Sequence, residues 1–191
     1  YEIRPCDWSS DVCSSDLYLL QCRPQSLAAR NEQVALPAHP APESVLFEAN
    51  RYVTTGHVNN VLTVVHVVPE AYGKLETLEE MKEVGRIVSR LNSLLPKRSF
   101  ILIGPGRWGS RGDIKLGVQV TYSDINRSAM LIEVAIAKDG YVPELSFGTH
   151  FFQDLVEADI KYLPLYPQEE GSSLARSFLE DGVNHLTRFL P

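Results

Sequence analysis

The sequence has no methionine at its start. Its first residue is Tyr1, and methionine occurs only at Met81 and Met130 among the 191 residues. A translated chain normally begins with methionine, so we expect this one to be the C-terminal piece of a longer protein. Its length leaves room for one substantial domain with an appendage.

Cysteine is sparse, and all of it lies near the start, at Cys6, Cys13 and Cys22. None belongs to a Cys-x-x-Cys pair or stands at a suitable spacing from a histidine, so no metal site is expected. An odd, small cysteine count fits a reducing cytoplasm, which is the location we expect.

Long apolar runs and an excess of basic residues are also missing. No stretch approaches the length of a membrane span, and no signal peptide is visible. The formal net charge of -6 gives no general electrostatic reason to bind nucleic acid or an anionic membrane. We therefore expect neither as a partner, whereas a small anion remains a candidate ligand for local clusters of basic residues.

Residues 1–17 lack the periodicity of a helix or a strand. The triplet Ser-Ser-Asp occurs twice, and the segment resembles translated sequencing-adapter read-through. It has too few apolar residues to build a core. We therefore expect it to be disordered and assign it no function.

The rest of the chain divides into a short strand, a linker and a domain. Leu17 to Cys22 is an apolar strand candidate that Pro24 halts. Residues 26–44 carry several prolines, which favour extended backbone and predict a linker. The main domain is expected over residues 45–191.

Hydrophobic periodicity in residues 45–191 alternates between strand and helix. Strands are predicted at Val61–Val68, Phe100–Ile103, Val118–Tyr122, Met130–Ile136 and Ile160–Tyr166. Helices are predicted from the capping-box pair Thr77 and Glu80 to Pro96, over Phe151–Glu157, and from Ser172 or Ser173 onward with Leu174, Phe178, Leu186 and Phe189 on one face. Interleaved elements predict a mixed α/β fold, a sheet flanked by helices, with a loosely held N-terminal strand and linker.

The first motif that could carry chemistry is the segment YLLQCRPQ, which starts at Tyr18. It resembles the last strand of the ATP-grasp domain of phosphoenolpyruvate synthases and pyruvate phosphate dikinases, where a strand ends in Leu-Gln-x-Arg-Pro. The resemblance places Gln21 among the groups that hold the ATP phosphates and metal, and Arg23 on phosphate. Arginine suits that role because its planar fork of donors matches phosphate oxygens. The alternative is an edge strand whose polar residues face solvent.

The same resemblance predicts a defect in the nucleotide site. In the family, an acidic metal-binding residue lies on the preceding strand, and here the adapter-like segment takes that place. ATP and Mg would serve the parent protein. We expect the fragment alone to bind ATP weakly or not at all and to need no cofactor.

The second motif is a glycine-rich loop directly after a buried strand. Its residues are Gly104, Gly106, Arg107, Trp108, Gly109, Ser110 and Arg111. Glycines let the backbone approach a ligand, and exposed amides beside two arginines suit an anion. The loop is neither a Walker A loop nor a dinucleotide fingerprint. The alternative is a connection between strands with Trp108 as a packing anchor.

The third motif is SFGTHFFQ, which starts at Ser146 and contains His150 at the expected start of a helix. It partly resembles the phosphohistidine segment of the same enzyme class, Gly-x-Thr-Ser-His followed by a helix, although Phe151 and Phe152 replace its small residues. The resemblance implies that His150 is the phosphorylated residue, and a helix N-terminus stabilises phosphate through free amides and its dipole. The alternative is a packed or capping histidine.

Three other features have simpler interpretations. His57 is a loop residue with a possible binding role, and His66 is a satisfied core histidine. The acidic residues Glu76, Glu79, Glu80 and Glu83 form the solvated face of a helix.

Three hypotheses for function remain open. In the first, the chain belongs to a bacterial ATP-dependent phosphotransferase, or kinase, that passes phosphoryl through a histidine to an acceptor such as pyruvate. Residues 45–191 would resemble the region that follows the ATP-grasp domain in some synthase-like proteins. In the second, they bind or sense an anionic metabolite through Arg107, Arg111 and His150 without catalysis. In the third, they dock the missing remainder of the ATP-grasp domain.

Overall fold

The computed structural model describes residues 6–13, 16–24, 40–54, 56–109, 117–136 and 144–190. The chain forms two compact units, Tyr1–Glu32 and Gln33–Pro191. The division falls inside the predicted linker.

The first unit contains an antiparallel hairpin of β1 (Cys6–Cys13) and β2 (Asp16–Pro24), with a shift in register between Ser9 and Ser10. The predicted strand Leu17–Cys22 lies within β2. The structure differs from the prediction of disorder over β1. The physical reason is that a hairpin pairs main-chain groups, so a strand can form without an apolar period.

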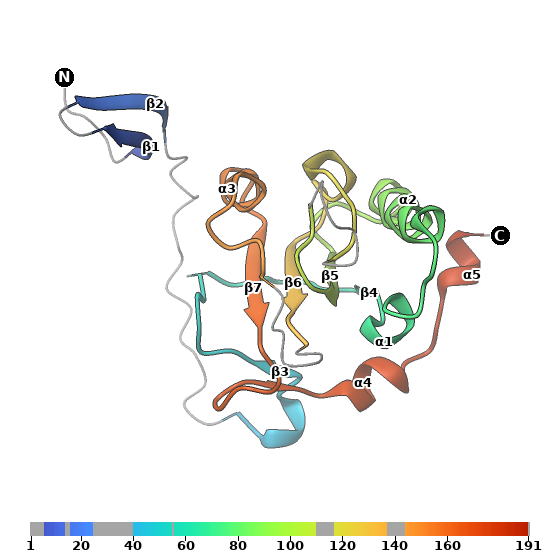
Figure 1. The fold of residues 1–191 in the computed structure, drawn as a ribbon. Coiled ribbons are helices and arrows are strands. Elements are labelled where there is room, and N and C mark those ends of the chain that lie inside the picture. Colours follow the sequence, from blue (N-terminus) through green and yellow to red (C-terminus); the bar gives the residue numbers. More distant parts are fainter. Residues whose placement is uncertain are drawn as a thin grey trace. The chain divides into compact units, whose positions relative to one another are not determined.

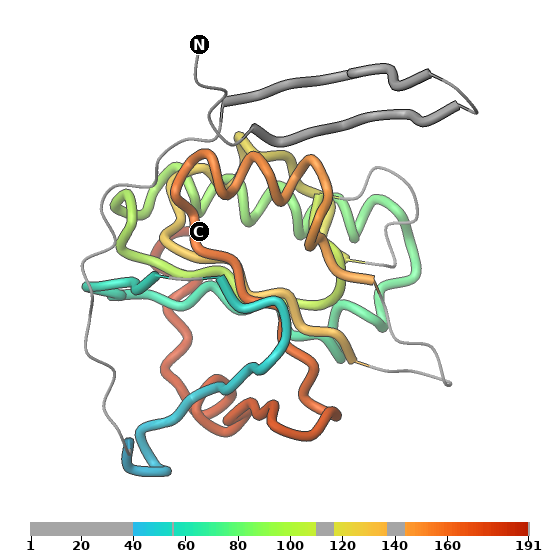
Figure 2. Tube along the Cα trace, turned by 90° about the vertical axis from the view of Figure 1, so that its left-hand side faces the viewer, coloured from blue at the N-terminus to red at the C-terminus, as the bar shows by residue number. Residues whose placement is uncertain are grey.

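The second unit is an α/β fold built on a four-stranded sheet. The strands are β4 (Thr63–His66), β5 (Phe100–Pro105), β6 (Met130–Val134) and β7 (Lys161–Leu165). They are all parallel, in the order β4-β5-β6-β7. Because right-handed crossovers between successive strands always return over the same face, this order places the connecting helices on one side of the sheet. Figure 2 shows the resulting layers, with the long green helix and the orange helix on one face of the sheet and the cyan and red segments that contain residues 47–48 and 173–174 on the other.

The longest helix, α2 (Leu78–Leu94), begins where the sequence predicts it. The Thr77 hydroxyl accepts from the Glu80 amide at 3.2 Å, and the Glu80 carboxylate accepts from the Thr77 amide at 3.0 Å. This reciprocal capping box satisfies donors that would otherwise be unpaired at the helix start. The four glutamates from Glu76 to Glu83 are exposed, as predicted. Across the residues that the structure describes, no helix is long and apolar enough to cross a membrane.

Shorter elements complete the helical face and the turns around it. They are α1 (Pro69–Tyr72), the 3-10 helix η3 (Tyr122–Asp124) and α3 (His150–Glu157). A second 3-10 helix, η1 (Pro42–Ser44), lies on the other side of the sheet. The predicted helix over Phe151–Glu157 is confirmed as α3.

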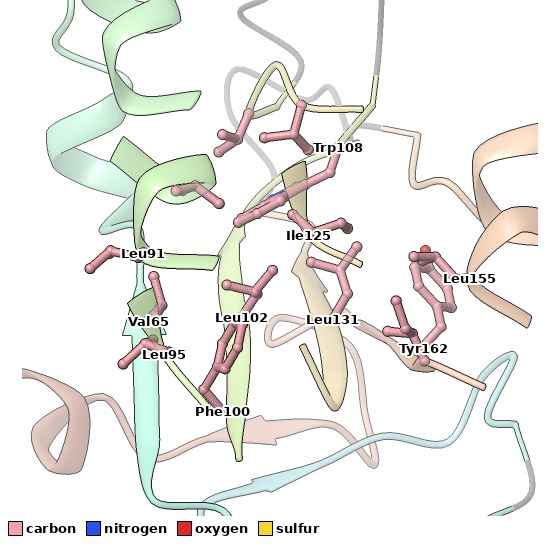
Figure 3. Packing of buried hydrophobic residues seen from close by; sticks show 14 of the residues in the cluster. Val65, Leu91, Leu95, Phe100, Leu102, Trp108, Ile125, Leu131, Leu155 and Tyr162 are labelled. Carbon is pink, nitrogen blue, oxygen red and sulfur yellow. The ribbon is translucent and has the colours of Figure 1, made fainter. Parts of the chain in front are cut away.

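Alternation along the strands creates two cores. On β5, Phe100 and Leu102 face the helices, whereas Ile101 and Ile103 face the opposite layer. Figure 3 shows the first core, in which Leu131 lies between Leu102 and Tyr162 along the sheet. Burying each such side chain stabilises the fold by about 1.5–3 kcal/mol. The two cores therefore fix the sheet between its two covering layers.

The layer opposite the helices comes from both ends of the second unit. The strand β3 (Phe47–Glu48) pairs with β8 (Ser173–Leu174), and α4 (Arg176–Glu180) follows. Phe47 and Leu174, which are register partners, both pack on the second core. The remaining helix, α5 (Leu186–Phe189), packs Phe189 against the first core.

Two predictions about these elements are wrong. Val118–Tyr122 is not a strand, because β5 and β6 pair directly and the Asp124 carboxylate caps a turn by accepting from the Thr121 amide at 2.7 Å. The single C-terminal helix is instead β8, α4 and α5. Pairing with β3 keeps Ser173 and Leu174 extended, and Gly182 lies between the two short helices.

Replacing Gly85 by alanine in α2 should destabilise the second unit. Alanine gains about 1 kcal/mol in helix propensity. However, a Cβ at this position would lie 2.3 Å from the main-chain oxygen of Gln119. Displacing a backbone segment costs about 1–3 kcal/mol, so we expect the clash to outweigh the gain.

Urea denaturation of Gly85→Ala would measure the change in the free energy of unfolding. Ser93→Ala on the same helix is the control, since Ser93 is exposed and should change stability by only a few tenths of a kcal/mol. A Gly85→Ala protein as stable as the parent would contradict the close packing of α2 on residues 117–121.

Candidate functional site

The candidate site is organised around a buried carboxyl group near the carboxyl edge of the sheet. Glu133 lies on β6 and is fully buried. It faces the helical side, as Leu131 does two residues earlier. Burying a carboxyl group is costly unless hydrogen bonds satisfy it, so the partners of Glu133 show how the fold offsets that cost.

Both oxygens of Glu133 accept hydrogen bonds. Oε1 accepts from the Trp108 amide at 2.7 Å and lies 2.6 Å from the Ser146 hydroxyl. Oε2 accepts from the Ser146 amide at 2.6 Å and from the Tyr162 hydroxyl at 2.7 Å. One carboxyl group thus joins the loop after β5, the segment before α3 and strand β7.

The same bonds bring two of the predicted motifs together. Besides sharing Glu133, Ser146 Oγ lies 2.9 Å from the Trp108 carbonyl oxygen. Gly109, with φ of +71°, lies so close to α3 that an added Cβ would be 2.6 Å from the Phe151 ring. The glycine-rich loop and the SFGTHFFQ segment therefore form one structural unit.

Trp108 anchors the loop by packing. Its side chain is fully buried, and an added Cβ at Gly104 would lie 2.7 Å from its ring. Gly104 is therefore required for the close approach of the indole. Among the residues that the structure describes, the Trp108 Nε1 group has no hydrogen-bond partner. The packing-anchor alternative thus describes the Trp108 side chain, while its main-chain groups hold the loop.

Burial raises the pKa of Glu133 to about 7, against an ordinary value of 4.5. Desolvation is the largest cause, and the hydrogen bonds from Ser146, Tyr162 and Trp108 oppose it. Burial also raises the pKa of the Tyr162 hydroxyl, and the nearby Glu133 charge raises it further. Tyr162 therefore stays protonated and acts as a donor.

His150 lies at the first position of α3. Thr149 is the N-cap residue, and its hydroxyl accepts from the Phe152 amide at 3.3 Å. The imidazole is exposed, and its Nδ1 lies 3.1 Å from Gln153 Oε1. Because an amide oxygen only accepts, this contact assigns the ring proton to Nδ1 and leaves a lone pair on Nε2 in the neutral imidazole.

Arg107 supplies a cation at the same edge. Its guanidinium lies 3.6 Å from the Glu144 carboxylate, and about a third of the arginine side chain is exposed, compared with most of Glu144. An exposed pair of this kind contributes little stability, so an anion can compete with Glu144 for Arg107. Ser110 and Arg111 lie outside the described residues.

A chain of aromatic rings links the surface to the buried carboxyl. Tyr52 stacks on Phe147 with ring centroids 4.5 Å apart, Phe147 contacts Phe152 at 5.0 Å, and Phe152 meets Tyr162 edge-on at 5.2 Å. Tyr162 donates to Glu133, so these contacts hold the donor in position. They also fix the segment before α3 through Phe147.

Other candidates lie apart from this arrangement. Gln21 and Arg23 lie on β2 in the first unit, and the placement of their side chains is outside the described part of the chain. His57 is an exposed loop residue, as predicted. His66 is half-buried rather than fully buried in the core, and burial is the main cause that lowers its pKa.

A groove of about 440 Å³ lies where α2 meets residues 119–124. Its lining is Lys82, Gly85, Arg86, Ser89, Arg90, Ser93, Gln119 and Asp124. Arg86 is ion-paired with Glu83 at 2.7 Å, and Asp124 accepts from Ser89 at 2.8 Å. Several of its polar groups thus bond within the fold, and we place the site at Glu133 instead.

Sequence reasoning missed Glu133 and Tyr162. A signal existed for the first, because Glu133 is a charged residue inside an apolar strand and therefore needs buried partners. Nothing in the sequence pairs it with residues 108, 146 and 162, which only the parallel sheet brings together.

Comparison with known proteins adds no relative. No family model, curated protein or solved structure matches the chain. Within the described ranges, no group of three or more His, Cys, Asp or Glu residues is arranged to hold a metal ion.

Glu133 should make stability depend on pH. Its folded pKa of about 7 exceeds the ordinary 4.5, so the folded state binds an extra proton between these values. The contribution to the free energy of unfolding is therefore full below about pH 4.5 and falls as pH rises to 7, by on the order of 3 kcal/mol. Urea denaturation at several pH values, taken as the difference between wild type and Glu133→Gln, would measure it.

Tyr162→Phe tests the cause of this pH dependence. Losing the hydroxyl donor should raise the pKa of Glu133 further and extend the fall in stability above pH 7. Tyr72→Phe is the matched control, because its buried hydroxyl donates to the Gly117 carbonyl at 2.9 Å and should leave the pH profile unchanged. Parallel profiles for wild type and Glu133→Gln would refute the assignment.

Proposed function

We propose that this chain is part of an ATP-dependent phosphotransferase resembling phosphoenolpyruvate synthase, and that its second unit binds a phosphate-bearing ligand at the carboxyl edge of the sheet. The observation that supports this proposal is the joining of the glycine-rich loop to the start of α3 through Glu133. Two motifs that each suggest anion binding thus contribute to one candidate site.

The chemistry of that place suits a phosphate group. Arg107 offers charged donors, and the start of α3 offers main-chain amides and the positive end of its dipole. In open α/β sheets, ligands bind outside the carboxyl ends of the strands, where these loops lie. The Gln21 and Arg23 roles, and the need for ATP and Mg, rest on the family resemblance alone.

A second candidate function is phosphoryl acceptance by His150. The contact between Nδ1 and Gln153 favours it, because the ring then presents the lone pair of an exposed Nε2. In this step Nε2 forms a bond to phosphorus, the bond from phosphorus to the leaving group breaks, and its electron pair leaves with that group. Binding or sensing of an anion without transfer is the alternative that the same residues also allow.

Arg107→Ala should weaken binding of inorganic sulfate or phosphate by about tenfold or more, because it removes a charge-assisted hydrogen bond. Isothermal titration calorimetry on the 191-residue chain would measure the dissociation constants. Arg176→Ala is the matched control, since Arg176 lies on α4 and forms an ion pair with Glu70 at 2.6 Å. Equal affinity in wild type and Arg107→Ala would contradict the proposed anion site.

Phosphoramidate, which transfers phosphoryl to imidazole with loss of ammonia, tests the second candidate. We expect His150 to be labelled at Nε2, because Gln153 occupies Nδ1. Phosphorus and nitrogen NMR would identify the labelled atom, with exposed His185 as the internal reference. Gln153→Ala should give a mixture of both ring positions. Labelling of His185 but not of His150 would leave anion binding without transfer as the function.

A further inference from the structure

We propose that Glu133 is the positioning residue of the anion site, and that an anion binds there together with a proton on the Glu133 carboxyl group. This inference rests on the proposed function, since it concerns the same two loops.

The positioning role follows from where the hydrogen bonds of Glu133 lead. They end on Trp108, next to Arg107, and on Ser146, three residues before the Thr149 cap of α3. Neither partner touches solvent, and nor does Glu133. The carboxyl group therefore acts on the site through the two segments that it holds, and it cannot itself contact a ligand.

Among the residues that the structure describes, no positively charged group acts on the buried carboxyl. The loop after β5 offers it an amide, the segment before α3 offers an amide and a hydroxyl, and β7 offers Tyr162. The titratable groups that interact with its charge, among the described residues, are the hydroxyls of Tyr162 and, more weakly, Tyr166. In this part of the chain the ionised form is compensated by hydrogen-bond dipoles, and their effect is smaller than that of burial, which favours the neutral acid.

The hydroxyl of Ser146 reports the protonation state. It lies 2.6 Å from Glu133 Oε1 and 2.9 Å from the Trp108 carbonyl oxygen, and it has one proton. When Glu133 is neutral, its O–H donates to Ser146, and Ser146 donates to the Trp108 carbonyl. When Glu133 is ionised, the Ser146 proton is drawn to the carboxylate, and the direct bond between the two loops is lost. Protonation thus fastens the glycine-rich loop to the segment before α3.

An anion at Arg107 and the start of α3 favours the same neutral state. It would add a second negative charge near an uncompensated buried carboxylate, so binding must raise the proton affinity of Glu133. By linkage, the proton raises the affinity for the anion by the same factor. For two charges about 10 Å apart at a protein surface, the factor is about tenfold.

Sulfate is the probe that tests this coupling, because it does not titrate near neutral pH. Histidine side chains in general change charge in this pH range. The measurements therefore compare two proteins that both carry His150→Gln, one with Glu133 and one with Glu133→Gln. With Glu133 present, we expect the dissociation constant to rise about fivefold between pH 6 and pH 8, which is the part of a tenfold coupling that falls in this range. With Glu133→Gln it should stay constant. Glu144→Gln is the matched control, since freeing Arg107 should tighten binding at every pH and preserve the pH dependence.

The outcomes separate this inference from the proposed function. No sulfate binding at any pH would overturn the anion site itself. Binding that is equally strong at pH 6 and pH 8 in the presence of Glu133 would overturn the coupling and leave the anion site standing. Should Glu133→Gln fail to fold, carbon-13 NMR of the Glu133 carboxyl decides instead. Saturating sulfate must raise the titration midpoint of that group, and an unmoved midpoint refutes the proposal.

Discussion

The loops at the carboxyl edge of the sheet depend on one buried carboxyl group. Glu133 accepts from two main-chain amides and a tyrosine hydroxyl at a fully buried position. Removing it would leave those donors unpaired, at a cost of about 1–3 kcal/mol for each. The loop after β5 and the segment before α3 are therefore held in one arrangement, although each alone is irregular backbone.

The free-energy cost of burying the Glu133 carboxyl group depends on pH. A hydrophobic residue on β6 would pack without desolvating a charge, but it would leave no acceptor for Trp108 and Ser146. The carboxyl group meets the geometric need and is stable there as a neutral acid. A strongly shifted acid beside a loop cluster is also the kind of group that functional sites contain, although structural networks shift pKa values too. The link to function thus depends on the neighbouring Arg107 and His150.

The sequence predicted the parts of the fold that local patterns specify. The capping box at Thr77 and the apolar period after it define α2, and the β-branched and apolar runs locate the central strands. Val118–Tyr122 has the same composition as a strand, but its place in the sheet is taken, and composition does not reveal that competition. Likewise, pairing of β8 with β3, more than 120 residues earlier, overrides the helical pattern at Ser173. These misses are both cases of tertiary contact outweighing local preference.

For the site, the sequence identified the two segments but not their connection. The loop containing Arg107 and the segment containing His150 each carry a recognisable pattern, yet they are separated along the chain by a strand and its flanking loops. Parallel strands bring their following loops to one edge, and Glu133, on the strand between the two segments, bonds to both. A charged residue inside an apolar strand is therefore the most informative feature that pattern reading can add. It marks where a fold needs several buried donors to converge, and here those donors belong to the two segments that carry the proposed chemistry.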